Sequence, residues 1–136
     1  LRDAIDADAA AFGGFAKVYA MPKTTPEEKA ARAAKMQETL KAAMAVPLQV
    51  METAAFCLEF VPRLAACGNT NLITDAGVAG VLLEAAARAA RLNVLVNLKF
   101  IKDEGLQAAT RARVAALADR AAALAAETAA IVEKSL

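Results

Sequence analysis

Apolar residues recur every three or four positions along most of the 136-residue chain, which is the spacing of one helix face. This pattern predicts four helices, over residues 2–20, 26 to about 67, about 72–102 and about 103–135. Residues 93–101 alternate in the way that a strand does, but no other segment of the chain could pair with them as a second strand. We therefore expect an all-α fold, an antiparallel bundle of long, kinked helices in a single domain, residues 1–136.

Each predicted helix has an apolar face of its own. The face of the first helix consists of Ala4, Asp8, Phe12, Phe15 and Tyr19. The stripe of the second consists of Leu40, Met44, Leu48, Met51, Ala55 and Leu58. The last helix carries a heptad-like seam of Val114, Leu117, Ala121, Leu124, Thr128 and Ile131. The third helix is apolar around most of its circumference, so we expect it to be the central and most buried one.

Capping residues and prolines mark the limits of the second helix. Thr25 suits its N-cap, Pro26 its first position, and Glu28 completes a capping box. Pro47 and Pro62 each remove a backbone donor, so kinks are expected near both.

The later helix ends carry weaker capping signals. Gly68 suits a left-handed cap at the end of the second helix. We expect Asn71 or Thr74 to cap the third helix, and Asp75 lies in its first turn. We expect Asp103 to cap the last helix.

Composition adds an expectation about assembly. The chain is 58% hydrophobic and rich in alanine, which is more apolar surface than an isolated small domain needs. We therefore expect a homodimer. The net charge of +1 favours neither nucleic acid nor an acidic membrane surface as a partner. The apolar region 72–101 is interrupted by charged residues, and the acidic start resembles no signal peptide, so we expect a cytoplasmic protein that does not cross a membrane.

The chemistry available to the chain is limited, because it contains no histidine. Acid–base catalysis must fall to Asp, Glu, Lys, Tyr or Cys, and no spacing typical of a metal or nucleotide site occurs. We expect Cys57 and Cys67 to be buried, reduced thiols with no redox or metal role.

Several polar residues stand in apolar surroundings and each has two interpretations. Asp75 either caps a helix or serves a site, and Asp8 is either a solvent-edge carboxylate or a functional one. Asn93 and Asn97 share a helix face, either as an inter-helix amide pair or as a reader of a heterocycle edge such as a pterin. Lys23 is either a solvated loop residue or a ligand-binding one.

Two stretches together resemble a known family. DADAAAFGGFAKVYAMPKTTPEEKAARAAKMQETLKAAMAVPL at 6–48 and GNTNLITDAGVAGVLLEAAARAARLNVLVNLKFIKD at 68–103 are similar to the methenyltetrahydrofolate cyclohydrolase / formiminotetrahydrofolate cyclodeaminase family. The resemblance implies an all-helical dimer acting on a tetrahydrofolate derivative, with folate as the substrate and no cofactor or metal. The family normally opens with a further helical segment that bears a glycine-rich motif, and nothing in this sequence matches it.

The resemblance also implies a set of site residues. Asp75 and Asp8 are the catalytic candidates, and the substrate-binding candidates are Lys23, Asn69, Asn71, Gly77, Asn93 and Asn97. The implied reaction is hydrolysis of 5,10-methenyltetrahydrofolate to 10-formyltetrahydrofolate. The alternatives are the cyclodeaminase reaction, which releases ammonia, and a non-enzymatic helical oligomer or adaptor. A chain without a fused transferase domain slightly favours the cyclohydrolase.

Overall fold

Helices make up most of residues 2–136, the part of the chain that the computed structural model describes; Leu1 lies outside it. In chain order they are α1 (Arg2–Tyr19), α2 (Pro26–Leu58), α3 (Val61–Cys67), the 3-10 turn η1 (Thr70–Leu72), α4 (Ile73–Leu98) and α5 (Glu104–Glu133). Residues 2–136 contain no strand, so the all-α prediction is confirmed.

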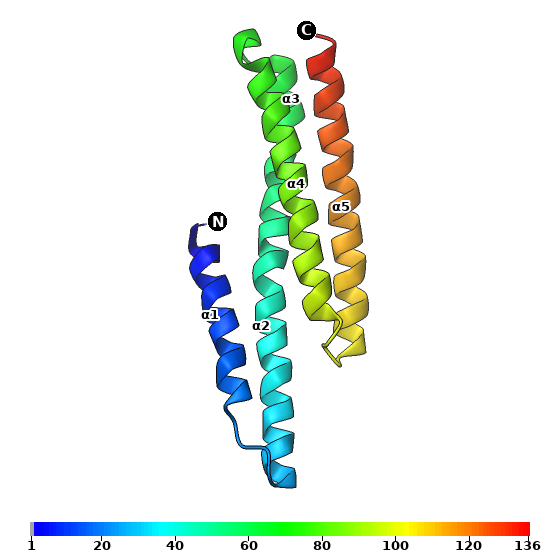
Figure 1. Cartoon of the computed structure of the whole chain (residues 1–136). Helices are drawn as coiled ribbons and strands as arrows, with labels where there is room; N and C mark the ends of the chain where they lie inside the picture. The colour runs from blue at the N-terminus through cyan, green and yellow to red at the C-terminus, as the bar shows by residue number, and fades with distance from the viewer. Residues whose placement is uncertain (1) are drawn as a thin grey trace.

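The helices form an elongated bundle (Figure 1). α2 and α3 run along its length, α4 returns antiparallel to α2, and α5 reverses direction again. α1 lies along one half of α2 only, so the chain begins part-way up the bundle. The C-terminus lies at the same end as α3 and η1.

The core lies where α2, α4 and α5 meet. Met51 and Leu58 of α2 are fully buried against Val94 and Leu98 of α4 and Val114 of α5. The stripes predicted for the second and last helices are confirmed, except that Val132 and not Ile131 is the last buried residue of α5. The bundle is therefore held by heptad-like packing of small and branched side chains.

α4 is less buried than its sequence predicts. Its inner face contributes Ala87, Val94 and Leu98 to the core. Its outer face is also apolar, and the side chains of Val78, Val81, Leu82, Leu92 and Val96 are between 55% and 66% exposed. The expectation that this is the most buried helix is wrong for one subunit, because α2 supplies more of the core and α4 has neighbours on one side only.

α1 packs through a different face from the predicted one. Val18 is buried, whereas Phe12 and Tyr19 are 76% and 65% exposed. A Cβ placed on Gly14 would lie 3.1 Å from the methyl carbon of Thr39, while a Cβ on Gly13 would meet nothing within 4 Å. The close approach of α1 to α2 at Gly14 leaves Phe12 and Tyr19 turned away from the core, whereas Phe15 is half-buried and packs against it.

The start of α2 follows the sequence closely. The Thr25 hydroxyl accepts from the backbone N–H of Glu28, and the Glu28 carboxylate accepts from the N–H of Thr25, so the capping box is confirmed. Pro47 is accommodated inside α2, but the helix ends at Leu58, shortly before Pro62. The predicted single helix to residue 67 is therefore two helices.

The segment between α3 and α4 departs from the predicted caps. Gly68 has φ −79°, so a left-handed cap is wrong; its Cβ would lie 2.3 Å from the Leu64 carbonyl oxygen, and this contact explains the glycine. No side chain caps α4, which excludes Asn71 and Thr74 as its caps. Cys67 at the end of α3 is exposed and Cys57 is half-buried, so the predicted burial of both thiols is wrong for Cys67.

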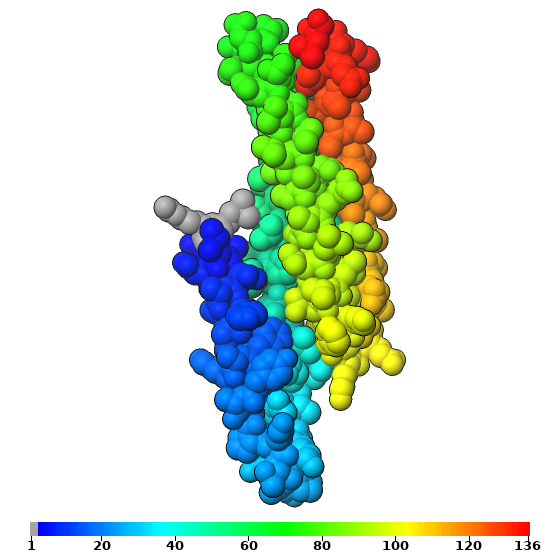
Figure 2. Space-filling model, viewed as in Figure 1, coloured from blue at the N-terminus to red at the C-terminus, as the bar shows by residue number. Residues whose placement is uncertain are grey.

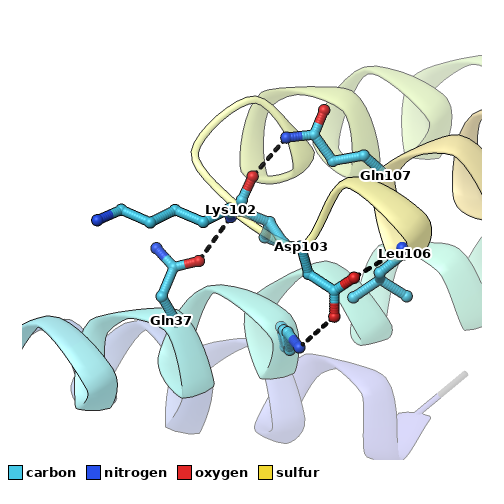
Figure 3. A network of polar contacts seen from close by, with 7 residues as sticks. Gln37, Lys102, Asp103, Leu106 and Gln107 are labelled. Atoms are coloured by element: carbon cyan, nitrogen blue, oxygen red, sulfur yellow. Dashed lines mark hydrogen bonds and ion pairs between the residues drawn. The ribbon is translucent and has the colours of Figure 1, made fainter.

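A polar network fixes the turn between α4 and α5 against α2 (Figure 3). Asp103 caps α5 as predicted, because its Oδ1 accepts from the N–H of Leu106 at 2.9 Å. Its Oδ2 accepts from Lys41 Nζ of α2 at 2.9 Å. The Gln37 side chain accepts from the N–H of Lys102 at 2.7 Å. The bonds from Leu106 and Lys41 lower the pKa of the Asp103 carboxyl below its ordinary value.

The segment Pro26–Cys67 contains one stretch long and apolar enough to cross a membrane by length and composition alone. The core helix of a soluble protein meets the same criterion, and α2 carries much of the core in this bundle. Packing within the bundle accounts for part of this apolar composition, since 39% of the stretch is buried.

Candidate active site

A furrow separates α1 from α4, with α2 at its base (Figure 2). It contains a hollow of about 600 Å³, lined by Ala4, Ile5 and Asp8 of α1, Val46, Pro47 and Val50 of α2, and Ala86, Ala89, Ala90 and Asn93 of α4. Among the described residues of this lining, only Asp8 and Asn93 carry polar side chains. The structure therefore brings one catalytic candidate and one binding candidate together in an apolar pocket, a common form of small-molecule site.

A second hollow continues the furrow toward the end of α1. It has a volume of about 460 Å³ and an aromatic lining from Phe15, Tyr19 and Phe100, with Asn97 on the α4 side. The Asn97 amide donates to the carbonyl of Asn93, one turn earlier, at 2.9 Å. The asparagines thus interact within α4, and the alternative of an inter-helix amide pair is not observed.

A third hollow of about 260 Å³ lies beyond the aromatic one and shares Met36 with it. Lys23, Lys29 and Arg32 gather around it. Arg32 Nε donates to the Val18 carbonyl at 3.1 Å. The two lysines are exposed and form no ion pair within residues 2–136, so this end of the furrow presents free positive charge.

The remaining predicted site residues lie at the other end of α4. Asn69 Oδ1 accepts from the N–H of Asn71 at 3.0 Å and thereby caps η1. A Cβ on Gly77 would lie 3.4 Å from Val132, so this glycine serves the packing of α4 on α5. Asp75 is exposed, and its carboxylate neither caps α4 nor forms another hydrogen bond or ion pair within the described chain.

One chain does not unite these two groups of residues. Asp75 and Asn93 lie five helical turns apart on the same line along α4, about 27 Å at the usual helical rise. Asp8, Asn93, Asn97 and Lys23 follow the furrow, whereas Asp75, Asn69 and Asn71 lie near the far end of the bundle.

The furrow includes residues that sequence reasoning did not select. Tyr19 and Phe100 line the aromatic hollow, and Lys29 lies in the first turn of α2 beside Lys23. Aromatic residues at helix ends could have indicated Tyr19 and Phe100 from the sequence. The surface of α2 that completes the hollow could not be identified in this way. Within residues 2–136 no group of three or more Cys, Asp or Glu side chains is placed to hold a metal ion.

The fold and the site define an all-helical domain with an apolar furrow, into which one carboxylate, that of Asp8, faces. A family model described as formiminotransferase-cyclodeaminase matches residues 1–116. The chain belongs to this family.

Two curated relatives and one solved structure that resemble this chain are named for different reactions. The pig formimidoyltransferase-cyclodeaminase is 42% identical over 121 residues, which cover 89% of this chain and 22% of the relative. A methenyltetrahydrofolate cyclohydrolase from Methylorubrum extorquens is 46% identical over 96 residues, 71% of this chain and 46% of the relative. The crystal structure of formiminotetrahydrofolate cyclodeaminase from Thermotoga maritima superposes with a TM-score of 0.70 at 29% identity, covering 98% of this chain and 61% of that one.

The chain thus spans less than half of the length of these curated relatives. The family model's match over residues 1–116 covers the furrow and the far end of α4 alike.

Proposed function

We propose that the protein hydrolyses 5,10-methenyltetrahydrofolate to 10-formyltetrahydrofolate, as a cytoplasmic homodimer. The observation that carries the proposal is that Asp8 and Asn93 are the only polar side chains among the described residues lining an apolar hollow of about 600 Å³. The relative with 46% identity that is named methenyltetrahydrofolate cyclohydrolase supports the same reaction.

The order of the three hollows suits the shape of a folate. The pterin edge presents both donors and acceptors, which the Asn93 amide complements. The aromatic hollow at Tyr19 and Phe100 suits the aminobenzoyl ring, because offset or edge-on ring contacts are favourable. The cations at Lys23 and Lys29 suit the carboxylates of the glutamate tail.

The chemistry requires no metal and no histidine. The substrate is a cation whose charge is shared between two nitrogens and the bridging carbon. Water adds to this carbon, the carbon–N5 bond breaks, and one proton is released to solvent. The negative charge of Asp8 stabilises the cation, and its oxygen accepts a hydrogen bond from the attacking water, which orients and activates it.

The cyclodeaminase reaction is the second candidate. The pig relative, matched over 89% of this chain, and the Thermotoga structure both carry that name. In this reaction N10 attacks the formimino carbon and ammonia leaves, so a carboxylic acid supplies the proton for the leaving nitrogen. Both reactions change bonds at one carbon, and the same hollow suits either.

Absorbance and ammonia measurements on the purified protein separate the two reactions. We expect the protein to accelerate the loss of methenyltetrahydrofolate absorbance without added metal or nucleotide. Ammonia release from 5-formiminotetrahydrofolate with no effect on the methenyl compound would replace the cyclohydrolase by the cyclodeaminase. Loss of activity with a chelator, restored by zinc, would contradict the metal-free mechanism.

A further inference from the structure

A proline inside α2 forms part of the lining of the main hollow. Pro47 is flanked there by Val46 and Val50, and α2 continues as a helix on both sides of it. Proline has no N–H. The carbonyl of Ala43, four residues earlier, therefore has no backbone donor at the position where a regular helix supplies one. The sequence thus leaves a hydrogen-bond acceptor without its helical partner beside the hollow.

The direction of this carbonyl follows from helix geometry. A helical carbonyl points along the axis at the nitrogen of the residue four positions later, which here is the nitrogen of Pro47. A proline ring collides with that oxygen in a straight helix, which favours a tilt of the carbonyl away from the axis. Ala43 lies one turn before Val46 and Pro47, between them on the helix circumference. The free acceptor is therefore on the α2 side of the hollow.

No side chain replaces the missing donor. Three threonine hydroxyls in the helices donate to the carbonyl one turn earlier, those of Thr39, Thr53 and Thr128. Among residues 3–136 no side chain donates to the Ala43 carbonyl in this way. Ala43 is only 8% exposed, and valine and alanine predominate in the nearby lining. An unpaired acceptor in apolar surroundings is unfavourable, so a ligand that brings a donor gains from pairing with it.

A polar contact between α2 and the end of α4 places Asn93 level with this carbonyl. The Gln37 amide donates to the Phe100 carbonyl at 3.0 Å. From this contact, Ala43 lies six residues along α2, and Asn93 lies seven residues back along the antiparallel α4. At the helical rise these separations are about 9 and 10 Å. The Asn93 side chain lines the same hollow, so its amide and the Ala43 carbonyl are at one height in it.

The pterin ring of a folate presents more donors than Asn93 can satisfy. Its 2-amino group carries two hydrogens, and the ring adds an N3–H. The Asn93 Oδ1 accepts one of these hydrogens, and Asp8 is assigned to the cationic carbon. A second uncharged acceptor at the height of Asn93 suits the remaining amino hydrogen.

We propose that the Ala43 carbonyl, left free by Pro47, accepts one hydrogen of the pterin 2-amino group while Asn93 accepts the other. Pro47 is then a specificity-determining residue, because its missing N–H keeps this acceptor available. The inference rests on the proposed folate function. It adds the group that distinguishes a 2-aminopterin from a ring without a donor at that position.

Binding of two stable compounds tests the contact. We expect the wild type to bind 5-formyltetrahydrofolate at least about 30-fold more tightly than its 2-desamino-2-methyl analogue, because the analogue leaves both acceptors unpaired. Pro47→Ala and Pro47→Val restore the N–H, and valine also keeps much of the side-chain volume. In both variants the preference should fall by about fivefold or more, because the carbonyl then has its helical partner.

The matched control removes a different proline. Pro62 occupies the first turn of α3, where an N–H has no helical partner in any case. Pro62→Ala should therefore keep the wild-type preference for the amino compound. Circular dichroism should show that all three variants retain their helix content. A loss of preference in Pro62→Ala equal to that in the Pro47 variants would overturn a local role for Pro47.

The carbonyl carbon resonance of Ala43 tests the free acceptor directly by NMR. In the free wild type it should lie upfield of the resonances of carbonyls in regular helical bonds, such as that of Ala42. Pro47→Ala should move it downfield, and so should 5-formyltetrahydrofolate added to the wild type. A resonance already in the range of bonded helical carbonyls in the free wild type would overturn the proposal.

The possible failures are distinguishable. Equal preference in the wild type and both Pro47 variants, together with turnover of a folate, would overturn the contact and leave the proposed function standing. A wild-type protein that neither binds 5-formyltetrahydrofolate nor turns over either folate substrate would remove the proposed function, and with it the pterin as the ligand of this carbonyl.

Discussion

Asp8 combines accessibility with apolar surroundings. It lies on the furrow side of α1, next to Ala4 and Ile5, and faces Asn93 across the hollow. Its carboxylate forms no hydrogen bond or ion pair with any other described residue, so folding does not depend on it. A carboxylate in this position is free to interact with a bound cation.

The change Asp8→Asn should therefore lower turnover by about 100-fold or more while leaving the melting temperature within a few degrees of wild type. The matched control is Asp6→Asn, on the same helix and also exposed, but absent from the lining of the hollow. Steady-state kinetics and thermal melts measure both effects. Equal losses in the two variants would show that general charge, and not position, matters.

Two adjacent glycines in α1 should respond in opposite ways to substitution. Gly13→Ala should stabilise the fold by up to about 1 kcal/mol, because nothing meets the added methyl and alanine favours helix. Gly14→Val should destabilise it, because even a Cβ at this position lies 3.1 Å from Thr39.

Urea unfolding of both glycine variants measures the difference. Gly13→Ala also serves as the control for any effect of helix propensity alone. Destabilisation by both substitutions would indicate that Gly13 has a close neighbour that the structure does not place there.

Sequence alone identified Asp8, Asn93 and Asn97 as polar residues in apolar surroundings, but it could not place them. The Asn97 side-chain amide donates to the carbonyl of Asn93 within α4. This bond depends on the rotamer of Asn97, which the spacing of the two residues in the sequence does not determine. Phe12 and Phe15 have the same apolar character in the sequence. Only the contact of Gly14 with Thr39 determines which of them turns inward.

At the level of elements, the turn between α4 and α5 depends on one carboxylate. The pKa of Asp103 is lowered because the charged form accepts from the Leu106 N–H and from Lys41. The Asp103 carboxylate therefore contributes to the free energy of unfolding at pH values above the pKa of an unfolded aspartate. This contribution is lost as the pH falls through the lower pKa of the folded state.

Asp103→Asn should accordingly flatten the decline in stability below about pH 4. Asparagine can still cap α5, so the variant should fold at neutral pH. Melting temperatures between neutral and acid pH measure the slope, with Asp119→Asn, an exposed position on α5, as the control. An unchanged slope in Asp103→Asn would contradict a role for this carboxyl in acid stability.

Helix limits could be predicted where the signal is local. The box at Thr25 and Glu28 and the cap at Asp103 are both contained in four residues, and both are confirmed. Gly68 could not be interpreted in this way, because its requirement comes from the Leu64 carbonyl oxygen and not from a positive φ. The outer face of α4 is apolar although no described residue covers it.

For the whole molecule, the proposed homodimer would give this exposed outer face of α4 a function. Leu82→Glu should convert the proposed dimer to a monomer, because pairing through this 64% exposed position would bury an unpaired charge. Light scattering at micromolar concentration measures the change, and circular dichroism should show that helix content is kept. Ala116→Glu, on the exposed side of α5, is the control and should remain dimeric.

The position of α1 has a consequence for how the molecule fluctuates. α1 packs on α2, and the hollows of the furrow separate it from α4. An element with neighbours on one side opens at lower free energy than the core, so amide hydrogens in α1 should exchange with solvent before those of α2 and α4. A folate that spans the furrow would join α1 to α4, and bound protein should exchange more slowly in α1 than free protein. Ligand binding would then be detected as a local change in stability.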